Sequence, residues 1–221
     1  YPGFPGQGLY GKPMEDVTFE DYVEALRDRI ENSHRKVILI GHSSAGLVLQ
    51  ELLGHPKVVL YIFINAFIIP VGTCQFDHVP PEAAGFMTML ANARPDKCVP
   101  VLDQKFHNAN DIPVEPFVES KLMAGENSEI TRKLIEEELV PQALGLFTGR
   151  VSKDPATLAN KAYLFCQDDM SLPPGAFLGM ASLLGGEVFL TDGGHEKLYV
   201  NPQSVFESLI QIIRKKLGLR S

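Results

Sequence analysis

The stretch from Lys36 to Gly54, KVILIGHSSAGLVLQELLG, constrains the fold of this chain more than any other segment. It opens with a short, apolar, β-branched run that is typical of a buried parallel strand. A turn of small residues follows, and the remainder has the spacing of a helix that ends at Gly54. The segment therefore predicts a strand, a very tight turn and a helix in immediate succession.

A turn of this kind can hold a nucleophilic serine at its apex. The residues two before and two after the apex must be small, because larger side chains would collide across the turn. With Ser43 at the apex these residues are Gly41 and Ala45, whereas with Ser44 the first would be the bulky His42. Ser43 is therefore the predicted nucleophile, and the backbone N–H of Ser44 is a predicted donor to an oxyanion.

The same turn has two simpler interpretations. Small residues often serve only to let a helix pack closely on a sheet, and a glycine-rich turn at a helix N-terminus can also bind phosphate. The stretch contains neither GxGxxG nor GK[ST], so residue identity argues against the dinucleotide-binding and P-loop forms.

The rest of the chain alternates between helical and strand patterns. Residues 18–33 form an amphipathic helix that begins at a Thr18–Asp21 capping box, and 58–70 form a second buried strand. Helix, strand, helix and strand in this order predict right-handed crossovers on a parallel sheet. Strand patterns return at 161–167 and 186–192, and a final amphipathic helix covers 201–218.

The pattern between residues 71 and 155 is different, because it predicts helices at 80–94, 115–125 and 128–149 and no strand of comparable quality between them. This predicts a helical lid inserted into an α/β core that consists of residues 1–70 and 156–221. The large apolar residues of the lid have two interpretations, an apolar pocket that excludes water or the lid's own core. They are Phe86, Met87, Met89, Phe117, Met123 and Phe147.

A serine nucleophile needs a histidine base and a carboxylate that orients the histidine. His195 follows a predicted strand and a Gly-Gly turn, which puts it where ligands meet open α/β sheets, and it is the predicted base. The strand at 161–167 is followed by Asp168 and Asp169, and alternation along the strand does not decide between them. Asp192 is a weaker candidate because it would have to fold back onto His195. Of the other histidines, His34 is interpreted as solvated and His55 lies in a turn between a helix and a strand. His78 and His107 lie in the predicted lid, and the ring of His42 is expected to point away from the apex of the turn.

Composition limits the partners of the chain. Hydrophobic residues make up 45% and charged residues 21%, which is typical of a soluble globular domain. The net charge of −7 argues against nucleic acid and anionic membranes as partners. Basic residues gather only at 213–221, as expected of the last turn of a helix.

The three cysteines, Cys74, Cys98 and Cys166, are odd in number and widely spaced, with no CxxC pair. We interpret them as reduced thiols of a cytoplasmic protein, with no metal site and no cofactor. No apolar run is long enough to cross a bilayer.

Taken together, VILIGHSSAG, YLFCQDDMSLPP and DGGHEKLYVNPQSVFESL resemble the nucleophile, acid and histidine segments of the α/β-hydrolase superfamily. PGFPGQG and VTFEDYVEAL are similar to a segment of the small-ester hydrolases related to plant methylesterases and hydroxynitrile lyases. The resemblance implies an α/β-hydrolase fold, a mostly parallel sheet flanked by helices with an inserted lid. Aligning Tyr163 with the start of the family's acid strand selects Asp169 as the acid.

The chain departs from this family at two places. Ala45 stands where the family usually has glycine, which is tolerable because alanine is small. The early His-Gly loop that donates the second oxyanion N–H has no counterpart among the 42 residues before Ser43, so we expect that amino-terminal strands are missing from the sequence. Loss of one such donor typically costs about 10²–10³ in rate.

The resemblance implies a serine hydrolase that cleaves a small, largely apolar ester or lactone through Ser43, His195 and Asp169. The resemblance does not decide whether the protein forms a homodimer. A lyase that cleaves cyanohydrins or C–C bonds is an alternative, but such lyases carry lysine directly after the histidine, where this chain has Glu196 and reaches lysine only at Lys197. A non-catalytic ligand-binding protein on the same fold is the third reading.

Overall fold

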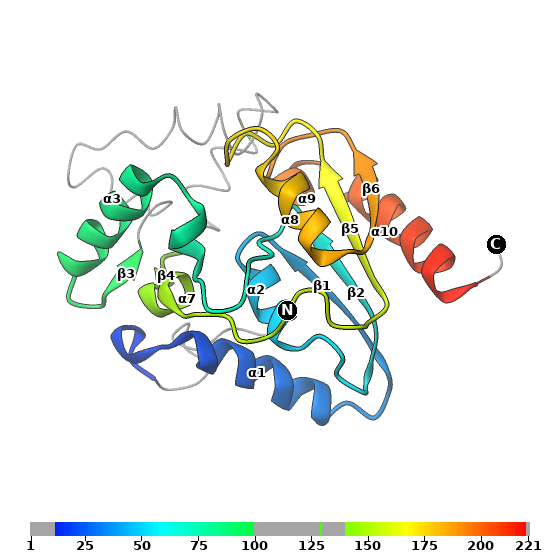
Figure 1. Cartoon of the computed structure of the whole chain (residues 1–221), viewed down its shortest axis with the longest axis horizontal. Helices are drawn as coiled ribbons and strands as arrows, with labels where there is room; N and C mark the ends of the chain where they lie inside the picture. The colour runs from blue at the N-terminus through cyan, green and yellow to red at the C-terminus, as the bar shows by residue number, and fades with distance from the viewer. Residues whose placement is uncertain (1–11, 100–128, 130–139, 220–221) are drawn as a thin grey trace.

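The computed structural model describes residues 12–99, 129 and 140–219. Its centre is a four-stranded parallel sheet, in the order β1 (Val37–His42), β2 (Val58–Ile64), β5 (Lys161–Cys166) and β6 (Glu187–Thr191). Each strand is followed by a helical connection before the next, and Figure 1 shows the strands side by side. The predicted parallel sheet is confirmed.

One face of the sheet is covered by α1 (Phe19–Glu31), α2 (Ala45–Glu51) and α8 (Ala176–Leu184). Tyr61 and Phe63 of β2 point into this layer and are almost fully buried. Alternate residues along a strand point to opposite faces, so this layer uses every second residue of β2.

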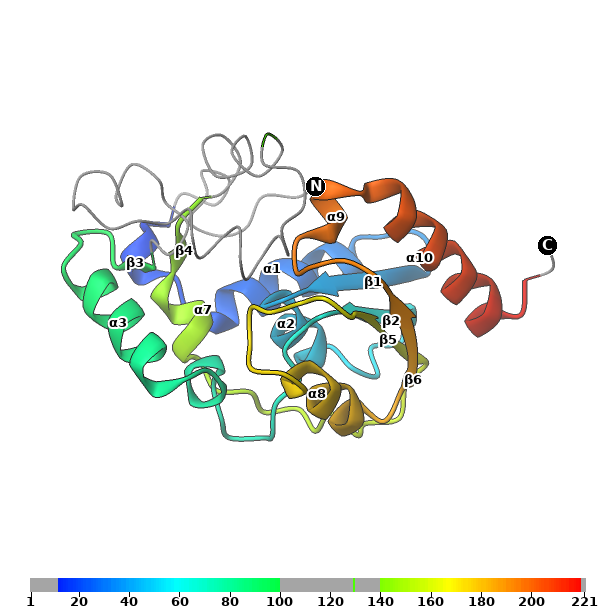
Figure 2. The same cartoon turned by 90° about the horizontal axis from the view of Figure 1, so that it is seen from above.

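The other face is covered by α10 (Pro202–Leu217) and the short helix α9 (Lys197–Val200). Leu60, Ile62 and Ile64 of β2 pack there against α10. Figure 2 shows α8 and α10 on opposite sides of the β5–β6 pair. With both faces covered, the central strands read as continuous apolar runs, as parallel strands do.

The helix ends follow the predicted capping chemistry. Thr18 and Asp21 form the reciprocal capping box of α1. The side chain of Asn201 accepts a hydrogen bond from the Ser204 N–H at the start of α10, and Gly218 ends that helix at φ 65°. Arg214, Lys215 and Lys216 lie in the last turn of α10, as predicted for the basic residues of a helix terminus, and Arg220 lies outside the described residues.

Part of the predicted lid falls within the described residues. It consists of η2 (Gln75–His78), α3 (Pro81–Asn92), β3 (Cys98–Val99), β4 (Gln142–Ala143) and α7 (Leu144–Thr148). These elements gather at one end of the molecule, near the start of α1 and the short helix η1 (Met14–Asp16) (Figure 1).

The helix predicted near residue 81 is confirmed by α3. The pairing of β3 with β4 was not predicted, because two-residue strands carry no alternation signal. The helix predicted at 115–125 and most of that at 128–149 lie outside the described residues, so the division into core and lid stays a prediction.

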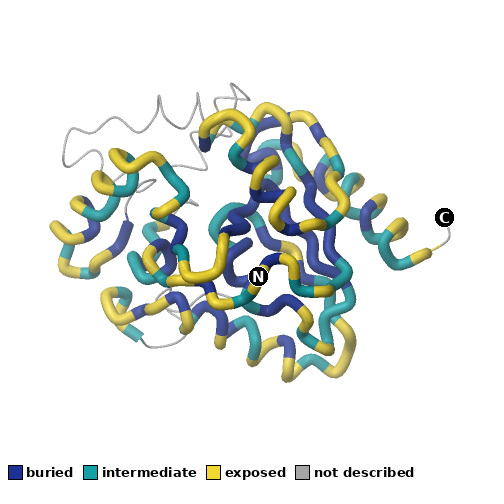
Figure 3. The backbone as a smooth tube through the Cα atoms, viewed as in Figure 1, coloured by how far each residue is buried: buried dark blue, intermediate teal, exposed yellow. Residues whose placement is uncertain are grey.

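Burial follows the layers, with dark blue tube along β2 and β5 and yellow along the outer faces of the helices (Figure 3). The three cysteines are buried and no two of them form a disulfide. Among the described residues no helix has the length and apolar character needed to span a membrane.

Candidate active site

Ser43 occupies the apex of the turn between β1 and α2, and its backbone has φ 54°. A positive φ is uncommon for residues other than glycine and is typical of functional sites where the surrounding structure holds the strain. Ser44 has φ −57° and is the N-cap of α2. Of the two adjacent serines, the strained one is therefore Ser43, as the spacing of small residues predicts.

The small residues around the turn are required by close contacts. A Cβ on Gly41 would lie 2.8 Å from Cδ2 of Leu49 and 3.3 Å from the carbonyl oxygen of Ala45, across the turn. A Cβ on Gly46 would lie 2.4 Å from the carbonyl oxygen of Phe67. The Gly46 contact is with backbone, so a side chain there would require the chain to shift, whereas a side chain at Gly41 would require Leu49 to move aside.

The structure brings Ser43, His195 and Asp169 together from three separate loops. Ser43 Oγ lies 3.0 Å from His195 Nε2, and His195 Nδ1 lies 2.6 Å from Asp169 Oδ2. The side chains of His195 and Asp169 are 6% and 0% exposed. Both distances are those of hydrogen bonds. Each of the three residues follows the carboxyl end of a parallel strand, where ligands meet such sheets.

The electrostatics of the pair favour proton transfer to the histidine. Burial disfavours a charged ring, but the hydrogen bond and negative charge of Asp169 outweigh it and raise the pKa of His195 above its ordinary value of 6.5. Burial acts to raise the pKa of Asp169, but the hydrogen bond from His195 and its positive charge lower it overall. Asp169 therefore stays ionised and holds the Nδ1–H tautomer of His195.

Two further side chains orient Asp169. Ser171 donates from its Oγ to Asp169 Oδ1 at 2.6 Å and from its N–H to the same oxygen at 2.9 Å. Asn65 donates from Nδ2 to Asp169 Oδ2, the oxygen that also faces His195. The sequence analysis assigned neither residue, although Asn65 interrupts the apolar run 58–70.

The side chain of His42 lies against His195, the predicted base. Its Nε2 lies 2.9 Å from the backbone oxygen of His195, and the two ring centroids are 4.5 Å apart. Burial and the positive charge of His195 lower the pKa of His42 to about 3, so its ring is neutral at physiological pH. A carbonyl oxygen only accepts, so the proton of this neutral ring is on Nε2. Phe177 of α8 lies against His195 with ring centroids 5.7 Å apart.

The residue after His195 also belongs to this region. Glu196 is 7% exposed, and its Oε2 has no hydrogen-bond partner among the described residues. Burial and the nearby Asp169 charge raise the pKa of Glu196, although His195 opposes them. Lys197 is also buried, but its Nζ binds the exposed Asp192.

The rejected acid candidates have other contacts. Asp168 accepts a hydrogen bond from the Gly193 N–H at 2.7 Å, and its own N–H donates to the Gly193 carbonyl oxygen at 3.1 Å. Asp168 therefore joins the acid loop to the histidine loop without touching His195. Asp192 is 85% exposed and pairs with Lys197.

The remaining histidines lie elsewhere. His34 is exposed, His55 lies in the turn before β2, and His78 contacts Thr73 Oγ1 through Nε2. His107 lies outside the described residues. None of the three described ones is in contact with Ser43.

The predicted oxyanion donor is in a suitable position. Ser44 precedes the first turn of α2, where backbone N–H groups have no acceptor within the helix. Its N–H is therefore available to an oxygen that develops charge beside Ser43.

The predicted apolar lid residues have mixed positions. Phe147 is buried and stacks on Phe76 at 5.4 Å, and Met87 packs against the main core. Phe86 and Met89 are 44% and 57% exposed. Phe117 and Met123 lie outside the described residues.

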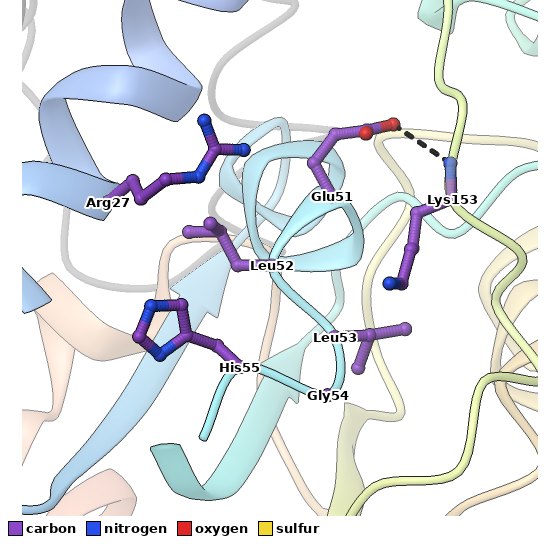
Figure 4. Close-up of a pocket in the computed structure, with 7 residues that line it drawn as sticks. All are labelled: Arg27, Glu51, Leu52, Leu53, Gly54, His55 and Lys153. Atoms are coloured by element: carbon purple, nitrogen blue, oxygen red, sulfur yellow. Dashed lines mark hydrogen bonds between the residues drawn. The ribbon is translucent and has the colours of Figure 1, made fainter. Parts of the chain in front are cut away.

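A polar pocket lies at the opposite end of α2 from Ser43 (Figure 4). Its lining residues are Arg27, Glu51, Leu52, Leu53, Gly54, His55 and Lys153. The Glu51 carboxylate there accepts hydrogen bonds from the backbone N–H groups of Ser152 and Lys153 and thereby anchors that loop. Ser43, His195 and Asp169 are not among the residues that line this pocket.

Solved structures with a similar fold include several esterases. An extracellular alpha/beta-hydrolase from a Paenibacillus species, described as homologous to tobacco salicylic acid binding protein 2, superposes with a TM-score of 0.79. It is 18% identical, and the match covers 97% of this chain and 85% of that one. Polyneuridine aldehyde esterase gives a TM-score of 0.63 at 19% identity, with 95% of this chain and 85% of that one covered. A methylesterase from Arabidopsis gives 0.65 at 15% identity, with 92% and 81% covered.

A search of curated proteins gives no match. The family model described as "Alpha/beta hydrolase family" matches residues 1–207, which is most of the chain. The structural neighbours have the same fold, and several are related to plant methylesterases, the group that the sequence resembles. This chain therefore belongs to the alpha/beta hydrolase family.

Proposed function

We propose that this protein is a serine hydrolase that cleaves a small, largely apolar carboxylic ester or lactone through an acyl-enzyme. The observation that carries the proposal is the continuous hydrogen-bonded chain from Ser43 through His195 to Asp169, with Ser43 at a strained apex. The named esterases among the structural neighbours support the reaction class.

In the first half of the reaction, His195 Nε2 takes the proton of Ser43 Oγ as that oxygen attacks the ester carbonyl. The carbonyl oxygen becomes an oxyanion, which the Ser44 N–H stabilises. Asp169 stabilises the imidazolium that forms and keeps its Nδ1–H oriented. His195 then gives its proton to the departing alkoxide, and the acyl group remains on Ser43.

In the second half, a water molecule replaces the alcohol. His195 removes a proton from this water as it attacks the acyl-enzyme, and a second oxyanion forms at the same place. Collapse of the intermediate returns the proton to Ser43 and releases the acid. Every proton that moves in this scheme is held by His195, which explains why its ring has to be neutral at the start.

Lyase chemistry on this scaffold is less well supported. Lys197, the lysine nearest to the base in sequence, is paired with Asp192, and the position directly after His195 holds a carboxyl group. A lysine placed for cyanide or carbanion chemistry is therefore lacking at that position, which favours ester hydrolysis.

The test compares the hydrolysis of p-nitrophenyl acetate and butyrate by the wild type, Ser43→Ala and Ser44→Ala. We expect Ser43→Ala to lose at least about 10³-fold in kcat, whereas Ser44→Ala keeps its backbone N–H and most of its activity. A fluorophosphonate probe should label the wild type and Ser44→Ala but not Ser43→Ala.

Equal rates for the wild type and Ser43→Ala would end the proposal. Cyanide release from mandelonitrile without ester hydrolysis would assign the chain to the lyases instead. Saturable binding of an apolar ester without turnover or labelling would assign it to the non-catalytic binders.

A further inference from the structure

His42, His195 and Glu196 gather three metal-ligating groups at one point. One ring nitrogen from each histidine and one carboxylate oxygen of Glu196 lie within 4.8 Å of one another. The three residues come from two places in the chain, the end of β1 and the loop before α9. The group is therefore assembled by the fold and not by one local motif.

Glu196 provides an independent sign that a ligand belongs here. Its side chain is more than nine-tenths buried, and Oε2 has no hydrogen-bond partner among the described residues. A buried carboxyl oxygen without a partner is costly, and such groups in native proteins are normally paired or coordinate a metal. A bound cation would satisfy this oxygen.

Each neutral ring has one nitrogen that carries a lone pair, although the lone pair of His195 faces Ser43 Oγ at 3.0 Å and an ion would have to displace that hydrogen bond. His42 faces the His195 carbonyl oxygen through Nε2, which must carry the proton, so its Nδ1 carries the lone pair. His195 faces Asp169 through Nδ1, so its lone pair is on Nε2. A carboxylate behind a histidine in this way is the usual outer partner of a metal-ligating imidazole, because it fixes the tautomer and raises basicity.

We propose that His42, His195 and Glu196 form a binding site for a divalent transition-metal ion such as Zn²⁺, and that the bound ion inhibits the protein. Two imidazoles and one carboxylate make a donor set that suits Zn²⁺, whereas Mg²⁺ and Ca²⁺ prefer oxygen donors. Bonds of about 2.0–2.2 Å to Zn²⁺ require the three atoms to lie closer together than 4.8 Å, so the side chains would have to draw together as the ion binds.

Inhibition follows from the atom that His195 contributes. The Nε2 lone pair that binds the ion is the one that receives the Ser43 proton, so ion and proton compete for the same electrons. This part of the inference rests on the proposed function. Binding itself does not, because it needs only the three side chains.

The experiment therefore measures binding in a protein that needs no activity. Zn²⁺ is titrated calorimetrically into Ser43→Ala and into the same protein carrying Glu196→Gln or His42→Gln. His55→Gln is the matched control, because His55 and Glu31 form a more exposed His–carboxylate pair that can also collect Zn²⁺. We expect micromolar binding to Ser43→Ala and to the His55 variant, and at least tenfold weaker binding when Glu196 or His42 is changed.

Melting temperatures with and without Zn²⁺ check that each variant folds, because an ion that binds only the native state raises Tm. If Glu196→Gln does not fold, His42→Gln decides the question, since a glutamine amide can still donate to the His195 carbonyl oxygen. Binding that is absent below millimolar Zn²⁺, or equal in all variants, would overturn the site.

The second arm tests inhibition in the wild type with p-nitrophenyl butyrate. Zn²⁺ at the concentration that saturates binding should remove most of the turnover, EDTA should restore it, and Mg²⁺ should have no effect. Full turnover with Zn²⁺ bound would overturn the inhibitory role. Should the wild type show no esterase activity at all, the proposed function fails while the calorimetry still decides the metal site.

Discussion

Asn65 donates a hydrogen bond to the same oxygen of Asp169 that faces His195. Its side chain also donates to the Cys166 carbonyl oxygen and accepts from the Cys166 N–H. One fully buried amide thus joins the carboxyl ends of β2 and β5 and fixes the carboxylate between them. Its backbone has φ 33°, which asparagine tolerates better than most residues.

Replacing Asn65 should affect both stability and activity. Asn65→Ala removes one buried hydrogen-bond partner from Asp169 and the side-chain contacts to Cys166, which we expect to cost about 2 kcal/mol in the free energy of unfolding and to lower kcat more than it changes KM. Asn65→Gly is the control for backbone strain, because glycine accepts the positive φ. Denaturant unfolding and ester kinetics measure the two effects, and an unchanged kcat in both variants would contradict the orienting role.

Ser171 should be needed for the position of Asp169. Its hydroxyl donates to Asp169 Oδ1, so Ser171→Ala should lower kcat about tenfold, the equivalent of one charged hydrogen bond. Ser182→Ala is the matched control, since that hydroxyl donates only to Leu178 O on the exposed side of α8. Steady-state kinetics with p-nitrophenyl butyrate should separate the two variants, and equal losses would count against the prediction.

The pH dependence follows from His195. Asp169 raises the pKa of His195 above 6.5, and only the neutral ring accepts a proton, so kcat/KM should fall as the pH decreases through a value above 6.5. Asp169→Asn removes the charge, which should move this acid limb to lower pH and reduce kcat by about 10⁴. Asp168→Asn should leave the limb in place. The profile of each variant over pH 5–9 is the measurement, and an unmoved limb in Asp169→Asn would refute the assignment.

Replacing two helical glycines with alanine should change the stability of the fold in opposite directions. Gly46→Ala would place a methyl group 2.4 Å from the Phe67 carbonyl oxygen, so we expect marked destabilisation and loss of activity. Gly179 in α8 has nothing within 4 Å of its added Cβ, so Gly179→Ala should stabilise the fold by about 1 kcal/mol. Thermal unfolding measures both, and a stable, active Gly46→Ala would show that α2 does not need this close approach.

The sheet and the principal residues were accessible from sequence because their signals are local. The turn around Ser43 is defined by residue size within a few positions, and the four strands are apolar runs bounded by turns. Chain order and a carboxyl-terminal strand position selected His195, although the choice of Asp169 over Asp168 needed the family resemblance.

The contacts around Ser43, His195 and Asp169 could not be predicted from the sequence, because they join segments that are far apart in the chain. Asn65 and Asp169 are 104 positions apart, and His42 meets His195 across 153. The burial of Glu196 depends in the same way on packing of the loop before α9. No spacing in the sequence encodes such pairs, since each is set by which strand ends are neighbours in the sheet.

The two reciprocal hydrogen bonds between Asp168 and Gly193 hold the loop that contains Asp169 against the loop that contains His195. Replacing the loop around His195 with a foreign loop, in order to alter substrate preference, would break these hydrogen bonds unless the loop that contains Asp168 is replaced with it. The two segments should therefore be exchanged as a cassette.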